Sequence, residues 1–463
     1  MNALPWLRLS LVTCILSGTS LLPGRDPAAG EVSFVRDVAP ILAAKCQSCH
    51  GPELAESSYR LDSYDALMRP GDHGTAPVTA GSVDDSEVYR LIAAEDPDER
   101  MPANGDRLTP HELATVAAWI NGGAKFDGAD ARAPLREIIL RDGSHPAAPA
   151  SYPFPIPVTA LAFTPDGSQL VVGGYHELLL FDPSTGALRN RIANMPQRVH
   201  GIALSNDGRW LVVAGGAPGL SGEVRLIRWD NGSLDDRATQ LLAASDDVML
   251  SVAFRPDGKE VAAGGADGSV RLFDIDAAAQ RLKIDHHADW VNAMQYSPDG
   301  KAIATGSRDK TAKVCDAASG ALLAAYSDHE ARVRSVAFTP DGACVISAGG
   351  AHVRQWKLAD STLVGEFTGA EKEVLALTLA GETLIAGGAD SAAKAFKAAD
   401  RSLVKSLAGH PSWILALAWS PASGRLAAGC FDGTVVVWRS DTWEQEARFA
   451  AAPLQAAAAP TQP

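Results

Sequence analysis

The sequence predicts a multidomain protein: a small all-α domain followed by an all-β propeller of seven blades. Three observations lead to this prediction. The hexapeptide KCQSCH, at 45–50, lies in a segment with helical character. A proline-rich stretch covers residues 127–157 and predicts a semi-rigid linker. Beyond it, a strand–turn–strand pattern recurs about every 42 residues, the length of a four-stranded blade.

The N-terminus predicts a signal peptide. A single Arg8 precedes an apolar stretch, 9–22, which is too short to span a bilayer comfortably but suits the core of a secretion signal. Small residues offer a cleavage site just before Glu31. We therefore expect residues 1–30 to be removed, leaving an exported, periplasmic protein without a transmembrane helix. An uncleaved leader that keeps the protein at the membrane is the alternative.

Residues 31–126 carry the pattern of a helical domain. Apolar residues at helical spacing predict a first helix over 32–45 that runs into the cysteine motif. A second helix is expected over 83–94, with a serine cap and acids in its first turn. The third begins at Thr109, where Glu112 completes a capping box, and it ends at a pair of glycines.

The charge of the chain restricts its partners. The formal net charge is −14, which argues against nucleic acid and anionic membranes as binding partners. Between residues 31 and 125, sixteen acidic residues stand against eight Lys or Arg, a net charge of −8. A partner of this domain is therefore expected to present a basic patch.

Residues 158–450 repeat one unit. The turn FTPDG (163–167) recurs as LSNDG (204–208), FRPDG (254–258), YSPDG (296–300), FTPDG (338–342), a degraded LAGE (379–382) and WSPASG (419–424). Four aspartates are placed to stabilise the turn that precedes the third strand of their repeats: Asp267, Asp309, Asp390 and Asp432. Two histidines, His329 and His410, precede strands as structural caps. Either Ile138–Leu140 or the strand near 447–449 could be the outermost strand at the point of closure.

These repeats resemble the WD40 family, which implies a seven-bladed propeller that docks a protein partner. The third strand of each repeat closes at an aromatic-type position followed by a polar residue, although the literal Trp-Asp pair survives only at 229–230. Three isolated cysteines in this region are expected to act as small buried hydrophobes: Cys315, Cys344 and Cys430. The Ala/Pro-rich residues 451–463 predict a disordered tail.

The Cys-x-x-Cys-His motif at 46–50 admits three chemical interpretations. A zinc site needs four ligands, and no second pair follows at a workable distance. A redox dithiol normally follows a strand, whereas a helix is expected before this motif. Haem attachment uses every residue: Cys46 and Cys49 reach the two vinyl groups, and His50 is carried beneath the iron as its proximal ligand. We predict one covalently attached haem c, with zinc and the dithiol as alternatives.

A second axial ligand is expected from Met101. Met68 and His73 lie in an unpatterned loop, and His111 is explained as a solvated first-turn residue of the third helix. Met101 lies in a loop before Pro102, which stiffens the presentation of the thioether. A thioether opposite a histidine favours ferrous iron and suits an electron carrier. The alternative is a methionine that merely fills the haem crevice.

The domain also resembles the planctomycete-type cytochrome c domain. The matching stretches are ILAAKCQSCHG (41–51), YRLDSYDAL (59–67), GSVDDSEVYRLI (81–92) and RMPANGDRLTPHELATVAAWINGGAKF (100–126). The resemblance implies that Cys46 and Cys49 bind haem and that His50 and Met101 are its axial ligands. The sequence departs from the family where Ala103 replaces the second proline of Met-Pro-Pro, and where the glycine-rich stretch before the second helix is thinned to 70–74.

The sequence therefore predicts an exported electron carrier with one haem c, rather than an enzyme, whose propeller is a protein-docking platform. We predict no catalytic residues. One alternative is a haem domain that feeds electrons to a catalytic or ligand-binding propeller. The others are a haem-based sensor with a weak sixth ligand and a scaffold that haem stabilises.

Overall fold

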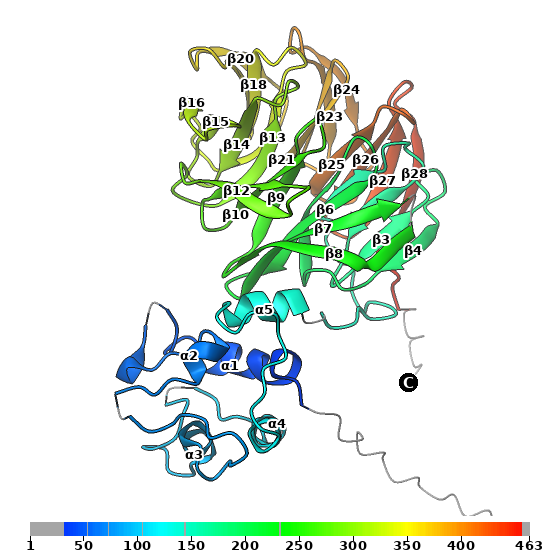
Figure 1. Cartoon of the computed structure of the whole chain (residues 1–463). Coiled ribbons are helices and arrows are strands. Elements are labelled where there is room, and N and C mark those ends of the chain that lie inside the picture. Colours follow the sequence, from blue (N-terminus) through cyan, green and yellow to red (C-terminus); the bar gives the residue numbers. More distant parts are fainter. Residues whose placement is uncertain are drawn as a thin grey trace, which may run out of the picture.

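The computed structural model describes residues 32–52, 54–72, 74–103, 105–142, 145–230 and 233–455. The predicted signal peptide lies outside the described residues, as do His73 and residues 456–463 of the predicted tail. Figure 1 shows a small helical part joined to a large ring of sheets. Within the described residues, no helix is long and apolar enough to cross a membrane.

The helical domain consists of short helices joined by loops. They are the π-helix η1 (Phe34–Val38), α1 (Ala39–Lys45), the 3-10 helix η2 (Glu56–Ser58), α2 (Tyr64–Leu67), α3 (Glu87–Ala93) and α4 (Pro110–Asn121). The predicted first helix is η1 followed directly by α1, and the hydroxyl of Ser33 caps it by accepting from the Arg36 N–H. The predicted capping box of α4 is confirmed: Thr109 and Glu112 bond reciprocally, and Gly122 is the C-cap.

The second helix begins later than predicted. Instead of starting at residue 83, α3 begins at Glu87. The hydroxyl of Ser82 donates to the Asp85 carboxylate at 2.6 Å, which closes a local turn rather than a helical cap. The N–H of Val83 is meanwhile bound to the Asn121 side chain of α4. These contacts satisfy the backbone without helical geometry, so the helix is shorter by one turn.

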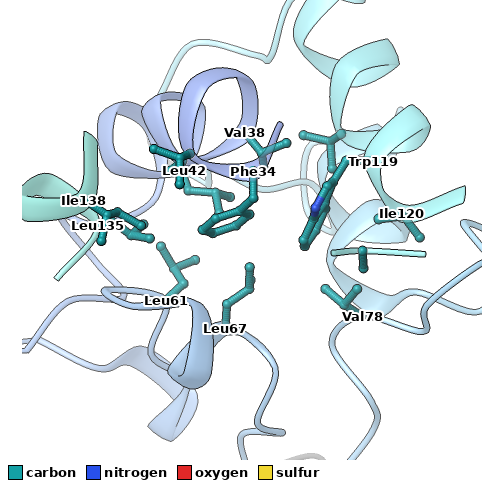
Figure 2. Close-up of a cluster of buried hydrophobic side chains, with 14 of the residues drawn as sticks. Phe34, Val38, Leu42, Leu61, Leu67, Val78, Trp119, Ile120, Leu135 and Ile138 are labelled. Carbon is teal, nitrogen blue, oxygen red and sulfur yellow. The ribbon is translucent and has the colours of Figure 1, made fainter. Parts of the chain in front are cut away.

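The core of the helical domain gathers side chains that lie far apart in the sequence. Phe34 and Ile120 are completely buried, and the rings of Phe34 and Trp119 lie 5.2 Å apart. Figure 2 shows Leu61 and Leu67 facing the same cluster from below these rings. Leu135 and Ile138 complete it from one side, so the core includes residues beyond the predicted boundary at 126.

These last two residues belong to α5 (Leu135–Asp142), a helix within the stretch expected to be a linker. In Figure 1, α5 lies between the helical domain and the long strands of the second blade. The guanidinium of Arg136 bonds the Leu220 carbonyl and lies 3.2 Å from the Asp246 carboxylate, both in the propeller. The stretch therefore attaches the two domains to each other.

The propeller has seven antiparallel four-stranded sheets in the described residues. Blade one consists of β1 (Leu161–Phe163), β2 (Leu170–Gly173), β3 (Leu178–Phe181) and β4 (Leu188–Ile192). Blade two consists of β5 (Arg198–Leu204), β6 (Trp210–Ala217), β7 (Ser221–Asp230) and β8 (Ser233–Ser245). Blade three consists of β9 (Met249–Phe254), β10 (Glu260–Gly265), β11 (Val270–Asp274) and β12 (Ala279–Ile284). Blades four and five are β13 (Val291–Tyr296), β14 (Ala302–Ser307), β15 (Ala312–Asp316), β16 (Leu322–Tyr326); β17 (Val333–Phe338), β18 (Cys344–Gly349), β19 (His352–Lys357) and β20 (Leu363–Phe367). Blades six and seven are β21 (Val374–Ala380), β22 (Thr383–Gly388), β23 (Ala393–Lys397), β24 (Leu403–Leu407); β25 (Ile414–Ser420), β26 (Arg425–Cys430), β27 (Thr434–Arg439) and β28 (Gln445–Ala450).

The ring closes without exchange of a strand between its ends. Every blade is built from four consecutive strands, and the first strand of the last blade, β25, packs directly against β1. Residues 447–449 lie in the outermost strand of the last blade, as one alternative proposed, whereas Ile138–Leu140 is helical. The tail is ordered further than expected, because Tyr152 N–H donates to the Pro453 carbonyl at 2.7 Å.

The local predictions for the propeller are largely confirmed. Each of the four repeat aspartates accepts a hydrogen bond from the backbone N–H two residues later; for Asp309 the N–O distance is 2.9 Å. Cys315 and Cys430 are buried as expected, but Cys344 is only partly buried. The described cysteines form no disulfide.

The structural histidine of blade five has a hydrogen-bond partner at Nε2 but none at Nδ1 among the described residues, and that of blade seven has none at either nitrogen. His329 Nε2 lies 2.7 Å from the Ser347 hydroxyl, which also accepts from Trp356 Nε1 at 3.1 Å. The equivalent residues of blade seven are His410 and Trp438, whose ring nitrogens have no hydrogen-bond partner among the described residues. The serine position is occupied there by the buried Ala428.

Restoring this hydroxyl is expected to stabilise the propeller. In Ala428→Ser, the new hydroxyl can bond both His410 and Trp438, which adds about 1 kcal/mol to the free energy of unfolding. Urea unfolding monitored by tryptophan fluorescence measures the change. As a matched control, Ser347→Ala is expected to lower the unfolding free energy, because it leaves the Trp356 N–H buried without a partner. A less stable Ala428→Ser variant contradicts the prediction.

Candidate haem site

The cysteine motif continues α1 as one further turn. Cys46 is the C-cap of α1, and its carbonyl accepts from the N–H groups of Cys49 (3.2 Å) and His50 (3.1 Å). Residues three and four positions apart on such a turn lie on the same side. The two thiols and the imidazole therefore face one region, as the haem interpretation requires.

The Cys46 thiol differs from that of an ordinary surface cysteine. Burial raises the pKa of Cys46 to about 12, and the neighbouring Cys49 contributes in the same direction. The thiols are close enough to interact, yet neither is in a disulfide. The Cys46 side chain is therefore a protonated thiol at neutral pH, packed against the apolar core of the domain.

The imidazole of His50 is oriented by the chain that returns beside it. Its Nδ1 lies 3.1 Å from the carbonyl oxygen of Tyr59, and the two rings meet edge to face at 5.5 Å. The Tyr59 hydroxyl in turn donates to the Leu67 carbonyl at 3.0 Å. A histidine that donates from Nδ1 to a backbone carbonyl keeps its other nitrogen unprotonated, which is the form that binds a metal.

Two methionines reach the same core as Cys46. Met101 and Met68 are both partly buried and pack against the cluster around Phe34. The backbone N–H of Met101 donates to the Leu91 carbonyl at 3.0 Å, which ties its loop to the end of α3. His111 is exposed in the first turn of α4, as expected, and His73 lies outside the described residues.

Two buried polar atoms without partners among the described residues also fit a bound haem, because they lie next to the predicted haem-binding residues in the sequence. Two buried side-chain polar atoms of the described helical domain have no hydrogen-bond partner: Gln47 Oε1 and Arg100 Nε. Buried polar groups are normally satisfied, so each such atom requires an explanation. Gln47 lies between the two cysteines of the motif, and Arg100 directly precedes Met101. Both unsatisfied atoms thus adjoin residues predicted to hold the haem.

The propeller histidines serve the fold. His287 bonds Asp309 through Nδ1 and Thr305 through Nε2, both at 2.8 Å. Desolvation lowers the pKa of His329 and of His410 to about 4, so both imidazoles are neutral at physiological pH. Among the described residues, no group of three or more His, Cys, Asp or Glu side chains is arranged to hold a metal ion.

Sequence reasoning missed two features near the motif residues: the contact of Tyr59 with His50 and the unpartnered Nε of Arg100. Tyr59 opens one of the stretches that resemble the cytochrome family, but no local pattern indicates that its carbonyl binds His50 nine residues earlier. The sequence alone distinguishes Arg100 only as the residue that precedes Met101. The signal that identifies both is three-dimensional: a hydrogen bond in one case and a missing partner in the other.

The comparisons with known proteins agree with this arrangement. Residues 46–105 match the family model described as Planctomycete cytochrome C. Four segments, 237–274, 279–316, 320–357 and 401–439, match the model described as WD domain, G-beta repeat. The first match begins at Cys46 and includes His50 and Met101.

Curated relatives are similar over parts of their length. The WD repeat-containing protein VIP3 of Arabidopsis thaliana is 30% identical over 142 residues, which cover 28% of this chain and 43% of that protein. An uncharacterized WD repeat-containing protein of Synechocystis is 29% identical over 119 residues, 25% of this chain and 32% of that one. Eukaryotic translation initiation factor 3 subunit I of Bombyx mori is 24% identical over 225 residues, 47% of this chain and 59% of that protein. The chain thus spans less than two thirds of each relative. The chain is thus similar to the planctomycete cytochrome C family over residues 46–105, and the segments similar to the WD domain lie in its seven-bladed propeller.

Proposed function

We propose that the chain is an exported mono-haem c-type cytochrome that transfers one electron, with the propeller as a protein-docking platform. The observation that carries this proposal is the turn at Cys46–His50, in which two free thiols and an oriented imidazole face one region. The match of this segment to the planctomycete cytochrome C family supports it.

Cys46 and Cys49 would hold the haem covalently. Each thiol adds across one vinyl group, so that a carbon–sulfur bond forms and the thiol hydrogen moves to the neighbouring vinyl carbon. No atom is lost and no oxidant is required. Such attachment takes place outside the cytoplasm, which is consistent with the predicted leader, and we propose a periplasmic location for the mature protein.

His50 and Met101 would both bind the iron. The Tyr59 carbonyl keeps the His50 ring in one orientation and leaves Nε2 to bind the iron. Met101, on the loop fixed by Leu91, would supply the thioether. Bound haem supplies exchange of one electron between the ferric and ferrous states, and the apolar surroundings of Cys46 and Met101 exclude water from it.

The propeller and the acidic helical domain would act together on partners. WD40 propellers provide surfaces for protein–protein interaction. In this chain, α5 holds the helical domain beside the propeller. The helical segment has a net charge of −8 between residues 31 and 125, which attracts a redox partner with a basic patch.

Covalent attachment is tested with cysteine variants. When the protein is produced with an export signal and a haem-attachment system, haem is expected to stay with the wild-type chain on a denaturing gel. Cys46→Ala/Cys49→Ala should lose it, because no thiol remains to form the thioethers. Cys344→Ala, in the propeller, serves as the control and should keep the haem. Haem that remains bound to the double variant contradicts the site.

The sixth ligand is tested by comparing the two methionines of the core. Met101→Ala is expected to abolish the methionine–iron charge-transfer band and to allow carbon monoxide to bind the ferrous protein, because it opens an axial position. Met68→Ala should retain the band. The reverse result would assign the ligand to Met68. Carbon monoxide binding to the wild-type protein would instead favour a sensor.

The proposed preference for a basic redox partner is tested by measuring how the rate of electron exchange depends on ionic strength. Electron exchange with a small basic redox protein is expected to slow by about tenfold between 0.01 and 0.1 M ionic strength, because the screening length falls from about 30 to about 10 Å. Stopped-flow absorbance of the haem measures this rate. Exchange with an acidic redox protein of similar potential, used as the control, should not slow. An equal response of both proteins contradicts electrostatic steering.

A further inference from the structure

Arg100 stands out among the basic residues of the helical domain. Four other arginines of this domain form ion pairs with a carboxylate at distances of 2.5 to 2.8 Å: Arg36, Arg60, Arg69 and Arg90. Arg100 makes no ion pair in the described part of the chain, and its buried Nε has no hydrogen-bond partner. A guanidinium therefore remains unpaired in a domain that contains twice as many acids as bases.

Two acids in the same loop, Asp96 and Glu99, have other partners. The Asp96 carboxylate accepts from the Asp98 N–H at 3.0 Å. Glu99 lies 3.6 Å from the guanidinium of Arg90. The backbone N–H of Arg100 donates to the Asp96 carbonyl at 3.0 Å, which fixes the chain while leaving the side chain unpaired. The structure therefore leaves a buried donor of this side chain without a partner among the described residues, which disfavours the folded state.

The position of Arg100 indicates what its partner is. It directly precedes Met101, which packs against the same core as Cys46, and it lies within the segment that matches the cytochrome family. A planar guanidinium recognises carboxylates through two parallel hydrogen bonds. Haem carries two carboxylates of its own, so a haem held by this domain would bring such a partner into the site.

We propose that Arg100 donates hydrogen bonds to a carboxylate of the bound haem and thereby raises the reduction potential of the iron. The inference rests on the proposed haem site. A positive charge near the iron disfavours the ferric state, which carries one more positive charge than the ferrous state. Pairing with the haem carboxylate also offsets a negative charge that would favour ferric iron. Arg100 is thus a residue that tunes the cofactor and does not bind the iron itself.

Three variants and the midpoint potential test this assignment. Arg100→Gln removes the charge, and Arg100→Lys keeps it. Arg107→Gln is a matched control: Arg107 also lacks an ion pair among the described residues, but it is exposed and donates to the Ala94 carbonyl at 3.3 Å. Potentials are measured by spectroelectrochemistry on holoprotein whose covalent haem and charge-transfer band have been verified.

Arg100→Gln is expected to shift the reduction equilibrium about tenfold toward the ferric state, which lowers the potential by about 59 mV for one electron. Arg100→Lys should recover most of this shift, and Arg107→Gln should match the wild type. If Arg100→Gln and Arg107→Gln have the same potential while the spectra are intact, the role of Arg100 is overturned and the proposed function stands. If the wild-type chain takes up no covalent haem, the proposed function itself fails first.

Discussion

A buried ion pair, Glu223 with Arg225, determines how the two domains are joined. Both side chains are almost completely buried, and Arg225 Nε lies 2.5 Å from a Glu223 carboxylate oxygen. The same guanidinium donates through Nη2 to the Leu140 carbonyl at 2.7 Å. Leu140 lies near the C-terminus of α5, where helix carbonyls lack partners of their own and carry partial negative charge. Breaking such a pair costs about 3–5 kcal/mol, so this contact holds α5 against blade two.

The attachment of α5 fixes the face of the propeller that meets the helical domain. Arg136 contacts Leu220, in the turn between β6 and β7, and Asp246, in the link from β8 to the next blade. In an antiparallel blade these two connections lie at the same end. Because Leu135 and Ile138 belong to the core of the helical domain, a single helix contributes to both structures. The helical domain is therefore held in a constant position relative to that end of the propeller.

Features that depend on contacts between residues close in the sequence could be predicted, whereas features that depend on distant contacts could not. The capping box at Thr109 and the turn at Asp309 involve residues two or three positions apart, so their patterns are complete in the sequence. The Cys46–His50 motif is equally local. The start of α3 was misplaced because Val83 bonds Asn121, which lies on another helix. The helix α5 was missed because its proline-rich flanks indicate a linker, whereas its stability comes from contacts with two domains. The contact of the Tyr59 carbonyl with His50 is likewise not revealed by any spacing.

The proline-rich segment also spans the closure of the ring between blades one and seven. Because no strand is exchanged between the ends, blades one and seven are joined by side-by-side packing of β1 and β25. Tyr152 crosses this seam: its N–H donates to the Pro453 carbonyl at 2.7 Å, its carbonyl accepts from the Gln455 N–H at 2.9 Å, and its hydroxyl bonds Glu177 of blade one. Glu177 is buried and paired with Arg191, which in turn binds the carbonyls of Pro149 and Ala150. The segment that attaches the helical domain thus also ties the first blade to the end of the chain, so loosening the segment would weaken the domain junction and the ring together.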